Sequence, residues 1–184
     1  MNDVNKELIK VSRDCDAILI PGGEKVVLVE GTHVRITQAL GGDYTVYVNG
    51  NLLKVNGKDA DAIGMKNDAK TEQKIIYDNK NNINEDDAWE VMKTCYDPEI
   101  PVNIVDLGLI YDLKLYEVDS GVDIKVKMTL TAPGCGMGPV IADDVKSKLS
   151  SLPKVLNVQV DLVWEPAWNQ SMMTDAAKLE LGML

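Results

Sequence analysis

The 184-residue chain lacks the residues on which several common catalytic and metal sites depend. Its single histidine, His33, excludes metal sites with two histidine ligands and disfavours a histidine-based catalytic triad. Its three cysteines, Cys15, Cys95 and Cys135, include no C-x-x-C pair. An odd number of cysteines without that spacing disfavours a disulfide framework and a zinc site built by this chain alone.

Basic residues and long apolar runs are also scarce. There are 19 Lys and Arg residues against 29 Asp and Glu, a net charge of −10. This disfavours a nucleic-acid partner, because phosphate binding needs clustered Lys and Arg. Apolar runs such as 26–29 are too short to span a bilayer, and the first ten residues contain no apolar signal core. We therefore expect a cytoplasmic protein with no nucleic-acid or membrane partner.

The first third of the sequence is typical of short β-strands separated by tight turns. Gly41-Gly42 and Asn49-Gly50 each separate two β-rich runs, and Asn-Gly in that position is a strong hairpin signal. Pro21-Gly22-Gly23 marks a further turn. The pattern predicts a small β-rich unit over 1–65, a meander or barrel, followed by a polar linker over 66–84.

Residues 85–184 carry most of the acidity, with 8 Lys against 17 Asp and Glu and hence a net charge of −9. Asn84 is a good N-cap for a helix that we expect to end at Pro98. Period-two alternation predicts strands at 107–115 and 122–130, the second with Thr129 facing outward.

A second helix is expected after Gly138, a third strand from Val158 to Trp164, and a last short helix capped by Thr174. The order helix, strand, strand, helix, strand predicts a two-layer α+β domain over 85–184. Its helices should cover one face of a small sheet.

Cys135 lies between Gly134 and Gly136, at the junction of the second strand and the second helix. With Gly138 as N-cap and Pro139 at the first helical position, the thiol would lie just before a helix start. Backbone N–H groups and the helix dipole favour a thiolate there, so we expect the pKa of Cys135 to fall below about 8.5. The glycines allow left-handed backbone and leave the sulfur approachable. The alternative is that Cys135 is a small apolar residue filling a tight turn.

The other two cysteines are less suited to chemistry. Cys95 falls on the apolar face of the first helix, which indicates a structural role. Cys15 has acidic neighbours, and these should raise its pKa.

Two further patches are candidate functional sites. The carboxylates of Asp97 and Glu99 could lie near Cys135 as co-ligands or proton acceptors, or Asp97 could simply cap a turn. The second patch comprises Trp168, Met172 and Met173, which could pack over the sheet edge or against a partner subunit.

Three stretches together resemble the SufT family of iron–sulfur cluster maturation factors. They are DPEIPVNIVDLGLIYDLKL at 97–115, MTLTAPGCGMG at 128–138 and WNQSMMTDAAKLELG at 168–182. The first unit is similar to the amino-terminal part of SufT through residues 13–46. The wider family resembles the PaaD proteins and the eukaryotic cytosolic iron–sulfur targeting proteins. One departure is Glu165-Pro166-Ala167-Trp168, where the family leads us to expect Asp-Pro-Pro-Trp.

The resemblance implies an α+β domain of the iron–sulfur cluster assembly type and a non-catalytic role in delivering clusters to apo-proteins. It implies that Cys135 is the reactive cysteine and that Asp97 and Glu99 form an acidic motif, which makes these three the candidates for binding a cluster or metal. It also implies a scaffold protein and apo-client proteins as partners, and we expect a homo-oligomer. The supporting loop residues would be Thr131, Pro133, Gly134, Gly136 and Met137.

Cluster chemistry limits what one chain can do. Iron–sulfur clusters are held by several cysteine thiolates, and this chain offers one exposed candidate, Cys135. A cluster would therefore be transient and shared between subunits, or completed by a partner's or a small molecule's thiols, or it would never bind here. Two other functions stay open: a thiol enzyme, for which no general base is evident, and an interaction adaptor in which Cys135 is structural and the acidic face binds a basic partner.

Overall fold

The computed structural model describes residues 8–66 and 83–183. The chain divides into two compact units, unit 1 over Met1–Gln73 and unit 2 over Lys74–Leu184. Nearly all of the linker predicted at 66–84 lies outside the described residues, so its boundaries stay a prediction. None of the described helices is long and apolar enough to cross a membrane.

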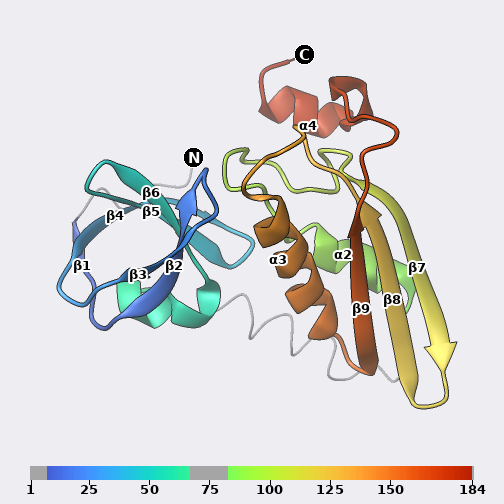
Figure 1. Cartoon of the computed structure of the whole chain (residues 1–184), viewed down its shortest axis with the longest axis horizontal. Helices are drawn as coiled ribbons and strands as arrows, with labels where there is room; N and C mark the ends of the chain where they lie inside the picture. The colour runs from blue at the N-terminus through green and yellow to red at the C-terminus, as the bar shows by residue number, and fades with distance from the viewer. Residues whose placement is uncertain (1–7, 67–82, 184) are drawn as a thin grey trace. The chain divides into compact units, whose positions relative to one another are not determined.

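Unit 1 is a six-stranded antiparallel sheet followed by a 3-10 helix (Figure 1). Its strands adjoin in the order β1-β4-β5-β6-β2-β3. The elements are β1 (Ile9–Lys10), β2 (Cys15–Ile20), β3 (Lys25–Leu28), β4 (His33–Leu40), β5 (Asp43–Val48), β6 (Asn51–Val55) and η1 (Gly57–Ile63). The β-rich character expected of this part of the chain is therefore confirmed.

Both predicted tight hairpins are present in unit 1. Gly41 and Gly42 join β4 to β5 with φ values of 60° and 85°, and Asn49 and Gly50 join β5 to β6 with φ values of 48° and 86°. Positive φ at both central residues is the turn geometry that matches the twist of antiparallel strands. Because Gly and Asn tolerate this conformation, these dipeptides fix the register of the hairpins.

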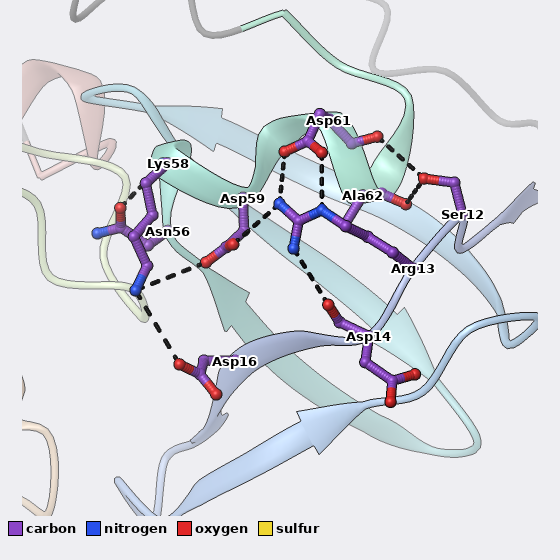
Figure 2. Close-up of polar contacts among 9 residues, drawn as sticks. All are labelled: Ser12, Arg13, Asp14, Asp16, Asn56, Lys58, Asp59, Asp61 and Ala62. Carbon is purple, nitrogen blue, oxygen red and sulfur yellow. Dashed lines mark hydrogen bonds and ion pairs between the residues drawn. The ribbon is translucent and has the colours of Figure 1, made fainter.

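An arginine clamp holds η1 against the start of β2 (Figure 2). Arg13 Nε lies 2.8 Å from Asp61 Oδ2, and its Nη2 lies 2.6 Å from Asp61 Oδ1 and 3.1 Å from Asp59 Oδ1. Next to it, the Ser12 N–H donates to the Ala62 carbonyl at 2.9 Å. The two hydrogen bonds between Arg13 and Asp61 raise the pKa of Arg13 and lower the pKa of Asp61.

Unit 2 is a three-stranded sheet with helices on one face (Figure 1). The strand order is β7-β8-β9, with β7 antiparallel and β9 parallel to β8. Helix α2 packs against β7 and α3, and α3 packs against β9. The elements are α2 (Glu85–Met92), β7 (Ile110–Val118), β8 (Gly121–Met128), α3 (Gly138–Ser150), β9 (Val155–Leu162), η2 (Gln170–Met172) and α4 (Asp175–Glu180). The chain therefore has the α+β class and the element order that we expected.

Helix α2 starts where the sequence predicts and ends earlier. The Asn84 side chain accepts the Asp87 N–H at 2.9 Å, and the Asp87 carboxylate accepts the Asn84 N–H at 3.1 Å, which forms a capping box. The helix ends at Met92, well before Pro98, so the expected end was wrong. The Thr94 N–H and hydroxyl both donate to the Val91 carbonyl, at 3.0 and 2.7 Å, which turns the chain out of the helix.

Strand β7 begins at Ile110, three residues later than the alternation predicts. Leu107 and Leu109 are fully buried, but both precede the strand, Leu107 within a turn and Leu109 just after it. Thr129 was expected to face outward and is 1% exposed instead, because it follows β8 and donates its N–H to the Leu109 carbonyl at 2.8 Å. The burial of Thr129 depends on a contact with a segment that is distant in sequence. The alternation of apolar and polar residues within one strand cannot predict such a contact.

Residues 165–174, the C-terminal strap, pack against the segment that leads into β7. Trp168 Nε1 donates to the Leu107 carbonyl at 2.8 Å, and the Tyr111 hydroxyl donates to the Pro166 carbonyl at 2.8 Å. The aromatic side chains are therefore held by hydrogen bonds to backbone some 60 residues away in sequence.

Asp106 anchors the other end of the C-terminal strap. Its carbonyl accepts the Thr174 N–H at 2.9 Å, and its Oδ1 lies 3.3 Å from Thr174 Oγ1. Asn103 holds Asp106 in turn, by donating its Nδ2 to Asp106 Oδ2 at 2.6 Å. Thr174 also caps α4 as expected, by accepting the Ala177 N–H at 3.2 Å.

Gly108 is the point at which the C-terminal strap comes closest to the β7 segment. Its φ is +72°, a left-handed conformation that favours glycine. A Cβ added there would overlap the Met172 carbonyl oxygen and lie 2.7 Å from the Met172 carbonyl carbon. Only glycine therefore allows this packing.

We expect Gly108→Ala to destabilise unit 2 by about 3 kcal/mol, the sum of left-handed strain and overlap with a backbone group. Urea unfolding followed by tryptophan fluorescence measures this, since Trp89, Trp164 and Trp168 all lie in unit 2. Gly134→Ala is the matched control, because Gly134 has a φ of +80° but no atom within 4 Å of an added Cβ. It should cost only about 1–2 kcal/mol. Equal losses in the two variants would contradict the close packing at Gly108.

We expect Arg13→Gln to raise the pKa of Asp61 toward its ordinary value, because the hydrogen bonds that favour its charged form are lost. In the native chain the lowered pKa of Asp61 stabilises unit 1 at pH values above the pKa of an aspartate in the unfolded chain, about 3.9. That stability is lost as the pH falls through the folded-state pKa. Carboxyl-carbon NMR follows the titration, with Arg35→Gln as the control because Arg35 is exposed on β4. An unchanged pKa of Asp61 in Arg13→Gln would show that the hydrogen bonds from Arg13 do not lower it.

Candidate functional site

The topology of unit 2 brings three of its connecting segments to one end of the sheet. Because β7 is antiparallel to β8 and β9 is parallel to it, the start of β7 lies beside the ends of β8 and β9 (Figure 1). The segment between α2 and β7, the segment between β8 and α3, and the C-terminal strap all connect at that end. The Thr129 N–H donates to the Leu109 carbonyl at 2.8 Å and so joins the first two of these segments. The Val163 N–H, just after β9, donates to the carbonyl of Met128 at the end of β8, also at 2.8 Å.

Cys135 lies on the surface of the segment between β8 and α3. It is partly exposed, whereas Cys15 and Cys95 are buried. The Cys135 N–H donates to the Ala132 carbonyl at 3.4 Å, and the Cys135 carbonyl accepts the Gly138 N–H at 3.1 Å, so two consecutive turns hold its backbone. Of the three cysteines, Cys135 is therefore the least buried.

The residues around Cys135 divide into an exposed loop and a buried anchor. Gly134 has a φ of +80° with open space around it, as expected of a glycine that leaves a neighbouring side chain approachable. Met137 is fully buried, and a Cβ on Gly138 would lie 2.5 Å from Leu130 Cδ1, so a larger residue there would force the Leu130 side chain to shift. Of the supporting residues, Thr131 is partly buried, and the exposed ones are Pro133, Gly134 and Gly136.

Helix α3 starts one residue earlier than the sequence indicated. Met137 is its N-cap residue, and the Met137 carbonyl accepts the Ile141 N–H at 2.9 Å. Gly138 is thus the first helical residue, where Pro139 had been expected. Cys135 lies two residues before the N-cap, so the thiol still precedes a helix start.

The acidic patch takes the form of a local turn. The Asp97 side chain is buried and accepts the Glu99 N–H at 2.9 Å, while the Asp97 carbonyl accepts the Ile100 N–H at 3.1 Å. Glu99 is exposed. Within 8–66 and 83–183, no group of three or more His, Cys, Asp or Glu side chains gathers in a way that could hold a metal ion. A role for Asp97 and Glu99 beside Cys135 therefore stays a prediction.

The three interaction candidates pack within unit 2. Trp168 is partly buried and bonded to Leu107, Met173 is 5% exposed, and Met172 lies against Gly108 with its sulfur 3.6 Å from the Tyr111 hydroxyl oxygen. Met172 also borders an open pocket of about 680 Å³ beside the start of β7. Its lining residues are Gly108, Ile110, Tyr111, Asp112, Lys127, Val163, Glu165, Pro166 and Met172.

Sequence reasoning missed the residues that hold this end of unit 2 together. Asp106, Gly108 and Tyr111 connect the segment before β7 to the C-terminal strap through the contacts described above. The signal that could have found them is the Asp-Leu-Gly run at 106–108, in which a glycine between leucines breaks the alternation of a strand.

Cys15 is poorly suited to react, as the sequence suggested. It is 5% exposed, and burial is the main cause that raises its pKa. The negative charge of Asp59 raises the pKa of Cys15 further, although the positive charge of Arg13 opposes that effect. A protonated, covered sulfur is a weak nucleophile and a weak metal ligand.

Comparison with known proteins assigns the second part of the chain to a family. The family model described as "Iron-sulfur cluster assembly protein" matches residues 85–161, which contain Asp97, Glu99 and Cys135. An "Fe-S protein maturation auxiliary factor" of Porphyromonas gingivalis is 49% identical over 102 residues, which cover 54% of this chain and 92% of that relative. The "Fe-S protein maturation auxiliary factor SufT" of Staphylococcus aureus is 46% identical over 87 residues, which cover 47% of this chain and 96% of the relative.

A solved structure gives a similar match. The crystal structure of a domain of unknown function, DUF59, from Bacillus anthracis is 37% identical and covers 54% of this chain and 92% of its own, with a TM-score of 0.49. The two auxiliary factors are aligned over nearly their whole lengths at identities well above 30%. The chain therefore belongs to the iron–sulfur cluster assembly protein family, in which relatives carry the name SufT.

Proposed function

We propose that this chain is an iron–sulfur cluster maturation factor that helps to deliver clusters to apo-proteins through the Cys135 thiol. The observation that carries the proposal is the contrast among its thiols. Cys135 is partly exposed in a glycine-containing loop within the family-matched residues, while Cys15 and Cys95 are buried. The names of the relatives, as maturation auxiliary factors, support a role that is not enzymatic.

Because the chain offers one partly exposed thiol, most ligands of a delivered cluster must come from elsewhere. A cluster needs several thiolates, and Cys135 supplies one, so the remaining ligands come from a second copy, a partner protein or a small-molecule thiol. A cluster bound by so few groups of the carrier also leaves readily, which suits transfer. Cluster binding by this chain is therefore transient, and Asp97 and Glu99 contribute carboxylates near the transfer step.

The partners of such a factor are a cluster scaffold and apo-client proteins. Residues 85–184 carry a net charge of −9, which favours basic surfaces on those proteins through long-range attraction. Apolar contact area is available at the same end of the sheet. It is provided by the pocket that Met172 borders and by Trp164, which is 43% exposed.

Cys135→Ser should lower the iron retained after anaerobic reconstitution, because serine does not replace a thiolate ligand. The measurements are absorbance of the cluster and iron counted per chain. Cys15→Ala is the matched control and should retain as much iron as the unmodified chain, because Cys15 is buried. Equal iron in Cys135→Ser and the unmodified chain would eliminate Cys135 as a ligand.

Iodoacetamide should modify Cys135 in the folded chain and should reach Cys15 and Cys95 only after unfolding, because alkylation requires an accessible sulfur. Intact mass should show one label per native chain and three labels in urea, with the site located by peptide mapping. Cys135→Ser should take no label while folded. Native labelling of Cys15 or Cys95 ahead of Cys135 would refute the accessibility on which delivery depends.

A further inference from the structure

Strand β9 ends the sheet of unit 2 with an unpaired edge. It pairs with β8 on one side, and no other strand within the described residues pairs with it. The Val163 N–H donates to the Met128 carbonyl, and backbone groups alternate in direction along a strand. Over the regular register at 157–162, the N–H and C=O groups that point away from β8 are therefore those of Val158, Val160 and Leu162.

This edge carries little of the protection that edge strands usually have. Val155–Leu162 is 8 residues long, contains no proline, and has Asp161 as its one charged residue. Lysines, prolines and short length are the usual means by which proteins prevent strand addition at an edge. An edge of this length with regular free backbone groups is therefore suited to pair with another strand.

A groove runs between this edge and helix α3. It encloses about 360 Å³ and is lined by Ala142, Asp143 and Lys146 of α3 and by residues 157–160 of β9. Asp143 and Lys146 are both exposed, and neither forms an ion pair or side-chain hydrogen bond with another described residue. By contrast, Lys148 on the same helix lies 3.0 Å from Asp144. One unpaired anion and one unpaired cation, one helical turn apart, thus face the groove.

We propose that two copies of this chain associate by antiparallel pairing of their β9 edges, with Asp143 of each copy facing Lys146 of the other. The two-fold axis passes near Gln159, so that Val158 of one copy pairs with Val160 of the other. Because α3 is the crossover between the parallel strands β8 and β9, it runs antiparallel to β9, and the two α3 helices lie antiparallel across the axis.

The charges of the groove select a second copy as the occupant. A two-fold interface requires a surface that is complementary to itself. Asp143 and Lys146 meet this requirement, because the rotation brings the anion of each copy to the cation of the other and forms two equal ion pairs. The same register brings Leu156, which is 56% exposed, near Leu162 at the far end of the other β9 and covers apolar surface. A strand of an unrelated protein would leave this chain monomeric on its own.

This dimer would limit how a cluster is held during transfer. That consequence rests on the proposed function, whereas the dimer itself does not. Antiparallel pairing points the ends of the two β9 strands in opposite directions, so the two Cys135 loops lie at opposite ends of a continuous six-stranded sheet. In this register the two Leu162 ends lie six residues apart along the paired strands, which is roughly 20 Å at about 3.3 Å per residue. Two Cys135 thiols therefore cannot hold one cluster, and the remaining ligands come from a partner protein or a small-molecule thiol.

Sedimentation of the full chain under reducing conditions tests the dimer. We expect twice the 20.2 kDa chain mass at micromolar concentration. Asp143→Lys and Lys146→Asp should each weaken the dimer by about tenfold or more, because like charges then meet at both symmetric contacts. The double variant Asp143→Lys/Lys146→Asp should restore the dimer by exchanging the charges. Asp119→Lys is the matched control, since it makes the same change of charge at the exposed turn between β7 and β8 and should leave the mass unchanged.

Hydrogen exchange locates the interface. The N–H groups of Val158 and Val160 should exchange slowly in the dimer and faster in Asp143→Lys. A monomeric wild type, a dimer that Asp143→Lys does not weaken, or a double variant that stays monomeric would each overturn the proposal. Cys135→Ser should remain dimeric, so the failure of cluster binding and the failure of β9 pairing are seen in separate measurements.

Discussion

The parallel pairing of β8 and β9 is the constraint on which the rest of unit 2 depends. Parallel neighbours cannot be joined by a tight hairpin, so the chain must cross over the sheet, and helix α3 makes that crossing. The crossover begins at the end of β8, which places the Cys135 loop beside the start of β7 and the C-terminal strap. It also places β9 at the edge of the sheet, where the backbone groups that point away from β8 pair with no other described strand.

The C-terminal strap follows the residues that the family model matches and packs against them. The matched residues end at 161, and the strap begins at 165. It is held by backbone hydrogen bonds of Leu107 and Asp106 and by close contact with Gly108, all of which belong to the matched region. The residues that the family model matches and the residues after them therefore pack together at one end of the sheet, to which the Cys135 loop also connects.

Local chemistry made much of the fold predictable. The capping residue Asn84 and the turn dipeptides Gly41-Gly42 and Asn49-Gly50 act through their own backbone conformation, and each has its predicted role. The features that sequence reasoning missed depend on distant contacts. Thr129 is buried because its N–H bonds to a segment 20 residues earlier, and Gly108 is required because a strap more than 60 residues later packs on it. In the site, the spacing of glycines identified the Cys135 loop, but no local pattern reports how a side chain such as that of Asp97 is buried.

The burial of Cys15 and Cys95 has a consequence under oxidative conditions. A sulfenic acid formed at an accessible sulfur is normally protected from further oxidation when a neighbouring thiol condenses with it. In this chain the other two thiols are covered, so an oxidised Cys135 finds no accessible resolving cysteine in its own molecule. Reduction of that sulfur then depends on an external thiol, so the reducing state of the surroundings determines how long Cys135 stays a thiol.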